Sequence, residues 1–128
     1  MDEYKRATDR LNEIATLIDN WNANGAEAFS SNLIEKCKRI LSKLPYAPEI
    51  YSTAINAIQF DYSRSNGDSL GLEIYEDRVR WFKVQTTEFG IWADGEIYED
   101  KIDQIVSLVE QFMKNWERNL NELRRAFF

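Results

Sequence analysis

Apolar residues recur every three or four positions in the first part of the chain, from Tyr4 to Trp21, with polar residues between them. This is the period of an amphipathic helix, and it predicts a helix over residues 2–22. Asn24-Gly25 follows, and because both residues tolerate positive φ, we expect them to cap the helix and turn the chain. Trp21 is then expected to be a buried anchor at the end of the helix.

A second helix is predicted over residues 31–44, with Ser30 or Ser31 as its N-cap and its apolar positions on one face. The Leu-Pro pair at 44–45 ends this helix, and the PYAPE segment predicts an extended linker. Cys37 lies on the apolar face, where a free cysteine packs as a small hydrophobe rather than reacting as a nucleophile.

The middle of the chain changes from the helical period to an alternation of apolar and polar residues, which is typical of strands with one buried face. Four strands are predicted, over residues 57–63, 69–75, 78–84 and, more weakly, 89–93. Because short turn sequences separate them, they are expected to form an antiparallel meander.

Turn chemistry predicts the register of these strands. A three-residue loop at 65–67 pairs Phe60 with Leu72, whereas a two-residue Asn-Gly turn would set Phe60 opposite Glu73 on the wrong face. The next connection, Glu-Asp, works as a two-residue turn. It places Glu73 opposite Arg80 on the outer face, which is a favourable cross-strand pair.

The C-terminal segment has the strongest period, and its heptad spacing predicts a helix over residues 101–126. At 1.5 Å per residue this helix is about 39 Å long, whereas strands of five or six residues are about 20 Å long. The second half of the helix is therefore expected to extend beyond the sheet, with Trp116, Leu120, Leu123 and Phe127 on its apolar face.

These apolar side chains need cover from another helix. The N-terminal helix of the same chain is the favoured cover, because its apolar stripe has the same spacing. A homodimer through the terminal helices is the alternative. In either case the expected fold is a single α+β domain over residues 1–128. It has two N-terminal helices, a four-stranded antiparallel sheet and one long C-terminal helix on the same face of the sheet.

The charge balance limits the function classes. Sixteen basic residues against 22 acidic ones give a net charge of -6, and such a surface repels phosphate backbones, so direct nucleic-acid binding is not expected. An acidic surface that occupies a basic nucleic-acid channel on another protein is compatible with this charge. No stretch approaches the roughly 18 apolar residues of a membrane span, and no signal-like segment or disulfide pair is present, so we expect a cytoplasmic protein without membrane contact.

The sequence lacks the residue sets of common enzymes. It contains no histidine, and it has no glycine-rich phosphate loop, GxSxG or HExxH motif. We therefore predict no catalytic residues, no cofactor and no metal. The alternative is a carboxylate-dependent, metal-binding enzyme that uses Glu96, Glu99, Asp100 and Asp103. Helix capping and first-turn acids explain most of this cluster.

Several short motifs carry a resemblance to a known family. They are NWNANGA at 20–26, Leu-Pro at 44–45, PEIYST and IQFDY between 48 and 62, and GLEI at 71–74. Over about residues 11–112 the chain resembles a family of small bacterial and mobile-element proteins whose function is uncharacterised. The resemblance implies an α+β fold and brings no catalytic residues. The chain departs from the family pattern at Asn22, where Asp is usual, and in having Asn-Ala rather than Gly-Gly at 56–57.

The aromatic content indicates an interaction surface. Four Trp, six Tyr and seven Phe exceed what one small core hides comfortably. Alternation places Tyr75, Arg80 and Phe82 on the outer face of the sheet, with Trp92 or Tyr98 at its rim. Aromatic residues mixed with charges are common in protein interfaces, although mutual shielding across strands explains them equally well.

The sequence therefore predicts a non-enzymatic protein-binding module of bacterial or phage origin. An inhibitor, an immunity protein and an anti-defence (anti-CRISPR-like) factor are the classes that fit this description. The partner is another protein, bound by the outer face of the sheet or by the apolar stripe of the long helix.

Overall fold

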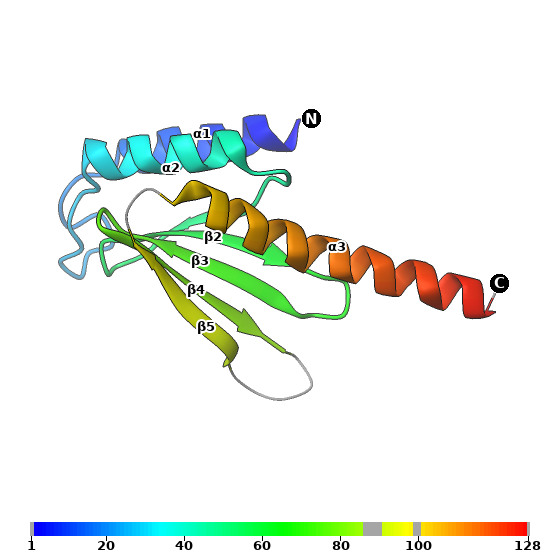
Figure 1. The fold of residues 1–128 in the computed structure, drawn as a ribbon. Coiled ribbons are helices and arrows are strands. Elements are labelled where there is room, and N and C mark those ends of the chain that lie inside the picture. Colours follow the sequence, from blue (N-terminus) through cyan, green and yellow to red (C-terminus); the bar gives the residue numbers. More distant parts are fainter. Residues whose placement is uncertain (1, 86–90, 99–100, 128) are drawn as a thin grey trace.

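The computed structural model describes residues 2–85, 91–98 and 101–127, and for residues 91, 92 and 115–127 it describes the backbone only. Over these residues the chain forms three helices and five strands, in the order α1 (Glu3–Ala15), α2 (Ser31–Lys43), β1 (Glu49–Ser52), β2 (Ile58–Ser63), β3 (Ser69–Ile74), β4 (Arg78–Val84), β5 (Ile91–Tyr98) and α3 (Ile102–Phe127). The strands form one antiparallel sheet in the order β1-β2-β3-β4-β5 (Figure 1). The α+β class is confirmed, and the prediction of four strands is wrong.

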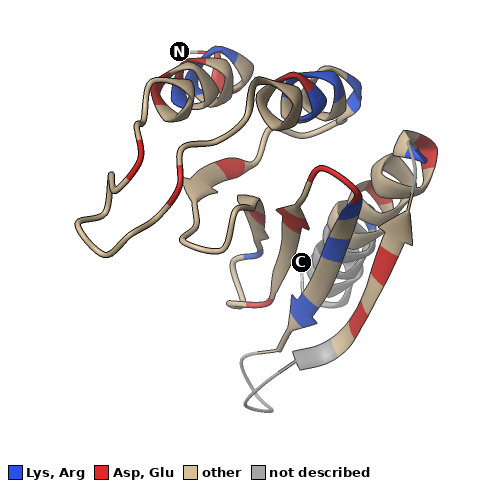
Figure 2. Cartoon of the chain, turned by 90° about the vertical axis from the view of Figure 1, so that its left-hand side faces the viewer, with Lys and Arg blue, Asp and Glu red and all other residues tan. Residues whose placement is uncertain are grey.

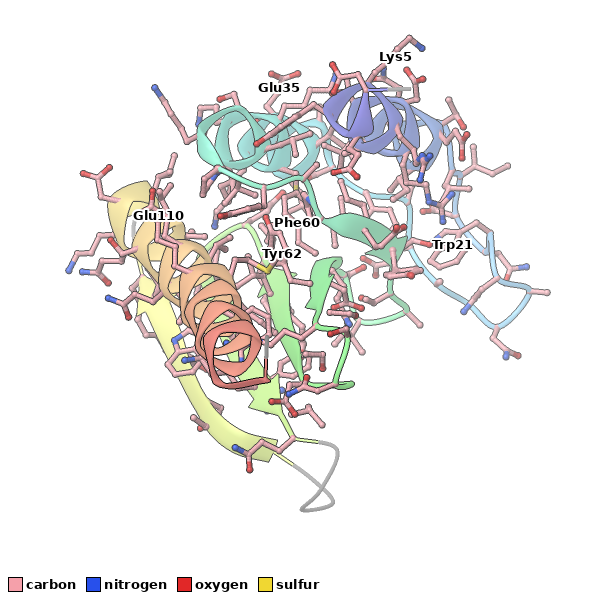
Figure 3. All side chains as sticks on the ribbon, turned by 90° about the vertical axis from the view of Figure 1, so that its right-hand side faces the viewer. Lys5, Trp21, Glu35, Phe60, Tyr62 and Glu110 are labelled. Atoms are coloured by element: carbon pink, nitrogen blue, oxygen red, sulfur yellow. The ribbon has the colours of Figure 1, made fainter. Side chains whose placement is uncertain are left out.

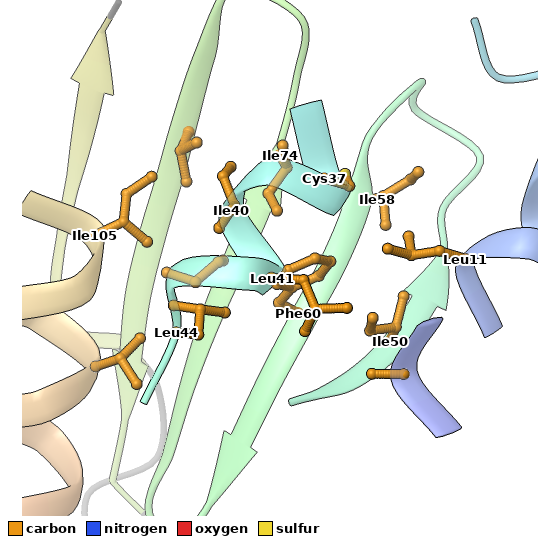
Figure 4. Close-up of a cluster of buried hydrophobic side chains, with 14 of the residues drawn as sticks. Leu11, Cys37, Ile40, Leu41, Leu44, Ile50, Ile58, Phe60, Ile74 and Ile105 are labelled. Atoms are coloured by element: carbon orange, nitrogen blue, oxygen red, sulfur yellow. The ribbon is translucent and has the colours of Figure 1, made fainter. Parts of the chain in front are cut away.

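The helices pack on one face of the sheet, and α2 lies between α1 and α3 (Figures 1 and 3). The opposite face, which we call the outer face, has no described helix against it. The core fills the space between the two layers (Figure 4). Its largest fully buried side chains come from every helix and from the three central strands: Leu11, Ile14, Leu33, Ile40, Ile58, Phe60, Leu70, Leu72, Ile74, Val79, Val109 and Phe112. Burial of each such side chain contributes about 1.5–3 kcal/mol, so this core provides most of the stability of the fold.

The predicted register of the central strands is confirmed. Phe60 pairs with Leu72, and Glu73 pairs with Arg80. The loop between β2 and β3 is closed by a hydrogen bond from the Arg64 N–H to the Asp68 carbonyl (2.8 Å), which leaves residues 65–67 as the loop. Gly67 has a φ of 93°, as the three-residue loop requires.

The predicted first helix is too long. α1 ends at Ala15 with Thr16 as its C-cap, and Ile18, expected on the apolar stripe, is 75% exposed. Trp21 is only half-buried; its indole N–H donates to the Glu27 carbonyl (3.0 Å).

Side chains in the following loop explain why the helix stops. The Asn22 side-chain oxygen accepts from the N–H groups of Asn24 (2.9 Å) and Ala26 (3.0 Å), and the Asn20 oxygen accepts from Gly25 (2.8 Å). Asn20 itself has a φ of 66°. Asparagine side chains that bond nearby backbone groups compete with the helical pattern, and here they outweigh the apolar period.

The additional strand begins at Glu49, the last residue of the predicted PYAPE linker, and continues through residues 50–52, for which no strand was predicted. β1 pairs with β2, with the buried Ile50 opposite Phe60. Arg10 on α1 donates from Nε to the Ile50 carbonyl (3.3 Å). A strand of only four residues has too short an alternation to be recognised in the sequence.

β5 also differs from its prediction, since it covers 91–98 rather than 89–93; residues 89 and 90 lie outside the described part of the chain. Asp-Gly pairs such as Asp94-Gly95 are common in tight turns. Instead, Gly95 lies in the middle of the strand against Trp81, and a Cβ at Gly95 would approach the indole to 2.7 Å. A glycine inside a strand often marks such a close approach.

The two strand glycines allow a matched test. Gly95→Ala is expected to lower the free energy of unfolding by about 2 kcal/mol, because Trp81 is packed on the core and cannot yield easily. Gly71→Ala, whose Cβ would meet the tip of the Phe82 ring at 2.3 Å, is expected to cost less than about 1 kcal/mol. Phe82 stands on the outer face and can swing into solvent. Urea unfolding of both variants checks this order, and equal losses would contradict it.

The long C-terminal helix is confirmed with its predicted bounds shifted by one residue, at Ile102–Phe127. Its second half extends beyond the strands (Figure 1). The predicted cover by the N-terminal helix is wrong, because α1 packs against α2 and β1, on the far side of α2 from α3 (Figures 1 and 3). The homodimer through the terminal helices stays a prediction.

Candidate functional site

The outer face carries a row of side chains that crosses all five strands in register. Tyr51, Gln59, Glu73, Arg80 and Glu96 are successive partners from β1 to β5. Paired residues of antiparallel strands project on the same side of the sheet, about 5 Å apart. The row therefore places one phenol ring, one amide, two carboxylates and one guanidinium group side by side.

Glu73 is the centre of this row. It is only 8% exposed although it lies on the uncovered face. The Arg80 guanidinium donates to Oε1 (3.2 Å), and the Tyr75 hydroxyl donates to Oε2 (2.9 Å). Burial, followed by this bond to Glu73, raises the pKa of the Tyr75 phenol. Because both carboxylate oxygens are bonded, the charge is kept in a shielded position and the three side chains are fixed relative to one another.

A second row runs beside the first through Glu49, Asp61, Gly71, Phe82 and Asp94. The Phe82 ring lies over Gly71, where the missing Cβ leaves room for it. The Asp61 pKa is raised by burial and, to a smaller extent, by the Glu49 charge, while a hydrogen bond from Gln59 (2.9 Å) acts in the opposite direction. This row contributes three more carboxylates to the outer face.

The turn between β3 and β4 closes one end of the outer face. The Arg78 guanidinium carbon lies 4.1 Å from the centre of the Tyr75 ring. Arg78 is also shared between two carboxylates, Asp77 at 2.9 Å and Glu96 at 3.8 Å. Tyr98, which is 54% exposed, donates its hydroxyl proton to Glu96. Aromatic and charged groups therefore alternate along this end.

A buried lysine positions this turn from below. Lys36 on α2 is 6% exposed, and its Nζ donates to the carbonyls of Tyr75 (2.5 Å), Glu76 (3.2 Å) and Arg78 (3.4 Å). Hydrogen bonds from a charged donor are stronger than neutral ones. Lys36 thereby ties the helix layer to the end of the outer face where Tyr75 and Arg78 lie.

A pocket of about 300 Å³ adjoins this turn at the start of α2. Its wall contains the apolar side chains of Phe29 and Leu33 and the carboxylates Glu27, Glu76 and Asp77. The Ser30 hydroxyl donates to Glu76, and the Asn56 amide donates to Glu27 (3.2 Å). Neutral donors thus hold two of the three carboxylates in place.

The structure brings together three of the candidate residues predicted from the sequence. Tyr75, Arg80 and Phe82 all lie on the outer face, the first two joined through Glu73. Sequence reasoning missed Glu73 as the shared acceptor and Tyr51 as a member of the row. The Glu73–Arg80 register was available as a signal, whereas Tyr51 belongs to the strand that was not recognised.

The other candidates are placed less fully. The positions of Trp116, Leu120, Leu123 and Phe127 lie in the part of α3 whose side chains are outside the described residues, as is the Trp92 side chain. The helix backbone at these positions extends away from the outer-face network (Figure 1).

The structure brings no metal-binding set together in its described part. Of the four carboxylates proposed for a metal enzyme, Glu96 is engaged by Arg78 and Tyr98, and Asp103 lies in the first turn of α3. Glu99 and Asp100 lie outside the described residues. Within residues 2–85, 91–98 and 101–127, no group of three or more potential ligands could hold a metal ion.

The single cysteine is confirmed as a core residue. Cys37 is fully buried in the helix layer, and burial raises the pKa of its thiol to about 12. The thiol is therefore protonated at neutral pH and is a poor nucleophile.

Comparisons with protein-family models, curated proteins and solved structures found no match to this chain. Among the described helices, none is both long and apolar enough to cross a membrane.

Proposed function

We propose that this chain is a non-enzymatic protein-binding module of bacterial or phage origin, in the class of inhibitors, immunity proteins or anti-defence factors. The outer face of the sheet is its binding surface. The observation that carries the proposal is the Tyr75–Glu73–Arg80 network, a shielded carboxylate with both oxygens bonded on a face that no described helix covers.

Two physical arguments support this surface. Side chains that are already fixed in the free protein lose little conformational entropy on binding, so a preformed network favours affinity. Tyrosine and arginine are enriched among the residues that contribute most to protein interfaces. Here Tyr75 and Arg80 are fixed by one acceptor, and the exposed rings of Tyr51 and Tyr98 flank them on the same face.

The proposal can be tested by comparing exposed residues on and off the outer face. The double variant Tyr51→Ala/Tyr98→Ala removes two rings that are 48% and 54% exposed. The control, Ile18→Ala/Ile55→Ala, removes two apolar side chains that are 75% and 58% exposed in loops. Neither pair is in the core, so both variants are expected to keep the wild-type melting temperature within about 3 °C.

Each protein is immobilised, exposed to lysate of its host, and the retained proteins are quantified by mass spectrometry. We expect the wild type and the loop control to retain the same host protein, and the outer-face variant to retain at least tenfold less of it. Equal retention by the two variants would contradict binding at this face. Recovery of the chain alone would contradict a heterologous partner.

A structural homodimer is the second candidate function. It is favoured by the uninterrupted α3 helix, which extends beyond the strands (Figure 1). Its apolar heptad pattern in the sequence suits pairing with another helix.

A further inference from the structure

We infer that the outer face and the adjoining pocket bind a basic protein surface, with one lysine or arginine side chain of the partner entering the pocket. This inference rests on the proposed function and adds the chemistry of the partner.

The charge of the outer face is the first observation. Its two rows and the adjacent strand end carry five carboxylates, Glu49, Asp61, Glu73, Asp94 and Glu96, and two guanidinium groups, Arg78 and Arg80. Arg80 is bound to Glu73, and Arg78 is shared between Asp77 and Glu96. Among the described residues, Glu49, Asp61 and Asp94 form no ion pair. A cationic partner would supply the charges that the face itself lacks.

The helices α1 and α2 lack such an acidic surplus. On α1, Lys5 pairs with Asp9 and Arg10 pairs with Glu13. α2 carries Lys36, Lys38, Arg39 and Lys43 against the single carboxylate of Glu35. Figure 2 shows basic and acidic residues mixed on these two helices, basic residues along β4, and acidic residues along β5 and on the β3–β4 turn. The negative potential is therefore directed toward the outer face, which steers a basic partner to that side.

The pocket gives the second observation. Tyr75, Glu76 and Asp77 belong both to the turn that ends the outer face and to the pocket wall, so the two surfaces are continuous. Phe29 and Leu33 supply an apolar wall against which an aliphatic stem can pack. Long basic side chains bury such stems while their charged heads stay near acceptors.

The charges in the pocket favour a cation. Glu27 and Glu76 accept from the neutral groups of Asn56 and Ser30, which orient the carboxylates and leave their charge in place. Lys36, the cation beneath the turn, donates to the backbone carbonyls of Tyr75, Glu76 and Arg78. Asp77 forms an ion pair with Arg78 at 2.9 Å, so it contributes less negative charge to the pocket than Glu27 and Glu76 do.

A second copy of this chain does not suit the same surface. Two outer faces brought together would each present the same excess of carboxylates, and like charges in contact across an interface are costly. The face is therefore assigned to a different protein with a basic surface.

The test uses a defined probe, a fluorescein-labelled 12-residue peptide that alternates arginine and serine. Its control replaces each arginine by citrulline, which has nearly the same shape and no charge. We expect fluorescence anisotropy in low salt to give at least tenfold tighter binding of the arginine peptide, with affinity falling as salt is added. Amide shifts in NMR spectra are expected at β3–β5 and at the pocket.

Two matched variants locate the binding. Glu27→Gln/Asp94→Asn removes one carboxylate from the pocket and one from the outer face. It is expected to weaken binding of the arginine peptide at least threefold. Asp9→Asn/Glu13→Gln on α1 makes the same change in net charge and is expected to stay within about 1.5-fold of the wild type. The inference would be overturned if both variants lost the same affinity for the arginine peptide, or if the NMR shifts were centred on α1 or α2. It would also be overturned if the protein bound the citrulline peptide as tightly as the arginine peptide. If the peptide fails while lysate capture still depends on Tyr51 and Tyr98, only the basic partner is rejected and the binding module stands.

Discussion

Phe112→Ala is expected to lower the free energy of unfolding by about 4 kcal/mol, the middle of the range for a buried phenylalanine cut to alanine. Phe112 is 2% exposed, and among the described residues it is the last fully buried position of α3. The Arg64 guanidinium carbon lies 3.8 Å from the centre of its ring. Burial lowers the pKa of Arg64. Loss of the ring therefore removes apolar burial and the aromatic cover of a desolvated cation at the same place.

Urea unfolding followed by circular dichroism measures this effect. Phe112→Leu keeps most of the volume and the Arg64 bond to the residue 112 carbonyl, and is expected to cost about 1.5 kcal/mol or less. Leu108→Ala changes a partly buried position on the same helix. It separates the specific loss of Phe112, which we expect to anchor α3 to the core, from a general weakening of α3. If Phe112→Ala were no more harmful than Leu108→Ala, Phe112 would not be the anchor.

The parts of the fold that depend on local chemistry were predictable from the sequence. The register of β2, β3 and β4 follows from two short turns, and turn length leaves few alternatives once the apolar residues must share a face. The α2 cap at Ser30 is likewise local, since its hydroxyl accepts from the N–H of Leu33, the third residue of the helix (3.1 Å). Such features need no knowledge of distant residues.

The errors in the fold arise where local rules conflict. Ile18 and Trp21 continue the helical period, but side-chain bonds from Asn20 and Asn22 hold the chain in a turn. In β5 the sequence Asp94-Gly95 is typical of a turn, and only contact with Trp81, fourteen positions earlier in the chain, shows why the glycine lies inside a strand. Periodicity identifies candidate elements, and tertiary contacts decide where they end.

The candidate site was predictable to a similar degree. Alternation alone placed Tyr75, Arg80 and Phe82 on one face, because strand period determines the side on which a residue projects. That Glu73 is shielded there, with both oxygens bonded, depends on two partners that meet only after β3 and β4 pair. The pocket depends on segments near residues 28, 56 and 76, and no sequence pattern joins them.

Lys36 is the residue whose role is hardest to infer from the sequence, because its acceptors lie 39 to 42 positions away. Lys36→Met is expected to lower the free energy of unfolding by about 3 kcal/mol. Methionine fills much of the same space and has no donor. The carbonyls of Tyr75 and Glu76 then lose their charged partner, and hydrogen bonds to charged groups contribute about 1.5–3 kcal/mol each. The Arg78 carbonyl keeps the Tyr75 N–H (2.9 Å), which limits the loss.

The matched control is Lys38→Met, two positions along α2, which removes the same charge from a partly exposed side chain and is expected to stay within about 0.5 kcal/mol of the wild type. Both are measured by urea unfolding, and the arginine peptide is then titrated under conditions where each variant remains folded. Because Lys36 holds the turn that carries Tyr75, Glu76 and Arg78, its loss is expected to weaken binding of the arginine peptide. The loss of affinity is expected to be at least threefold beyond any change seen with Lys38→Met. If Lys36→Met were as stable as the control and bound the peptide as tightly, the turn would be held by its own strand pairing. The ammonium would then have no part in positioning the binding face.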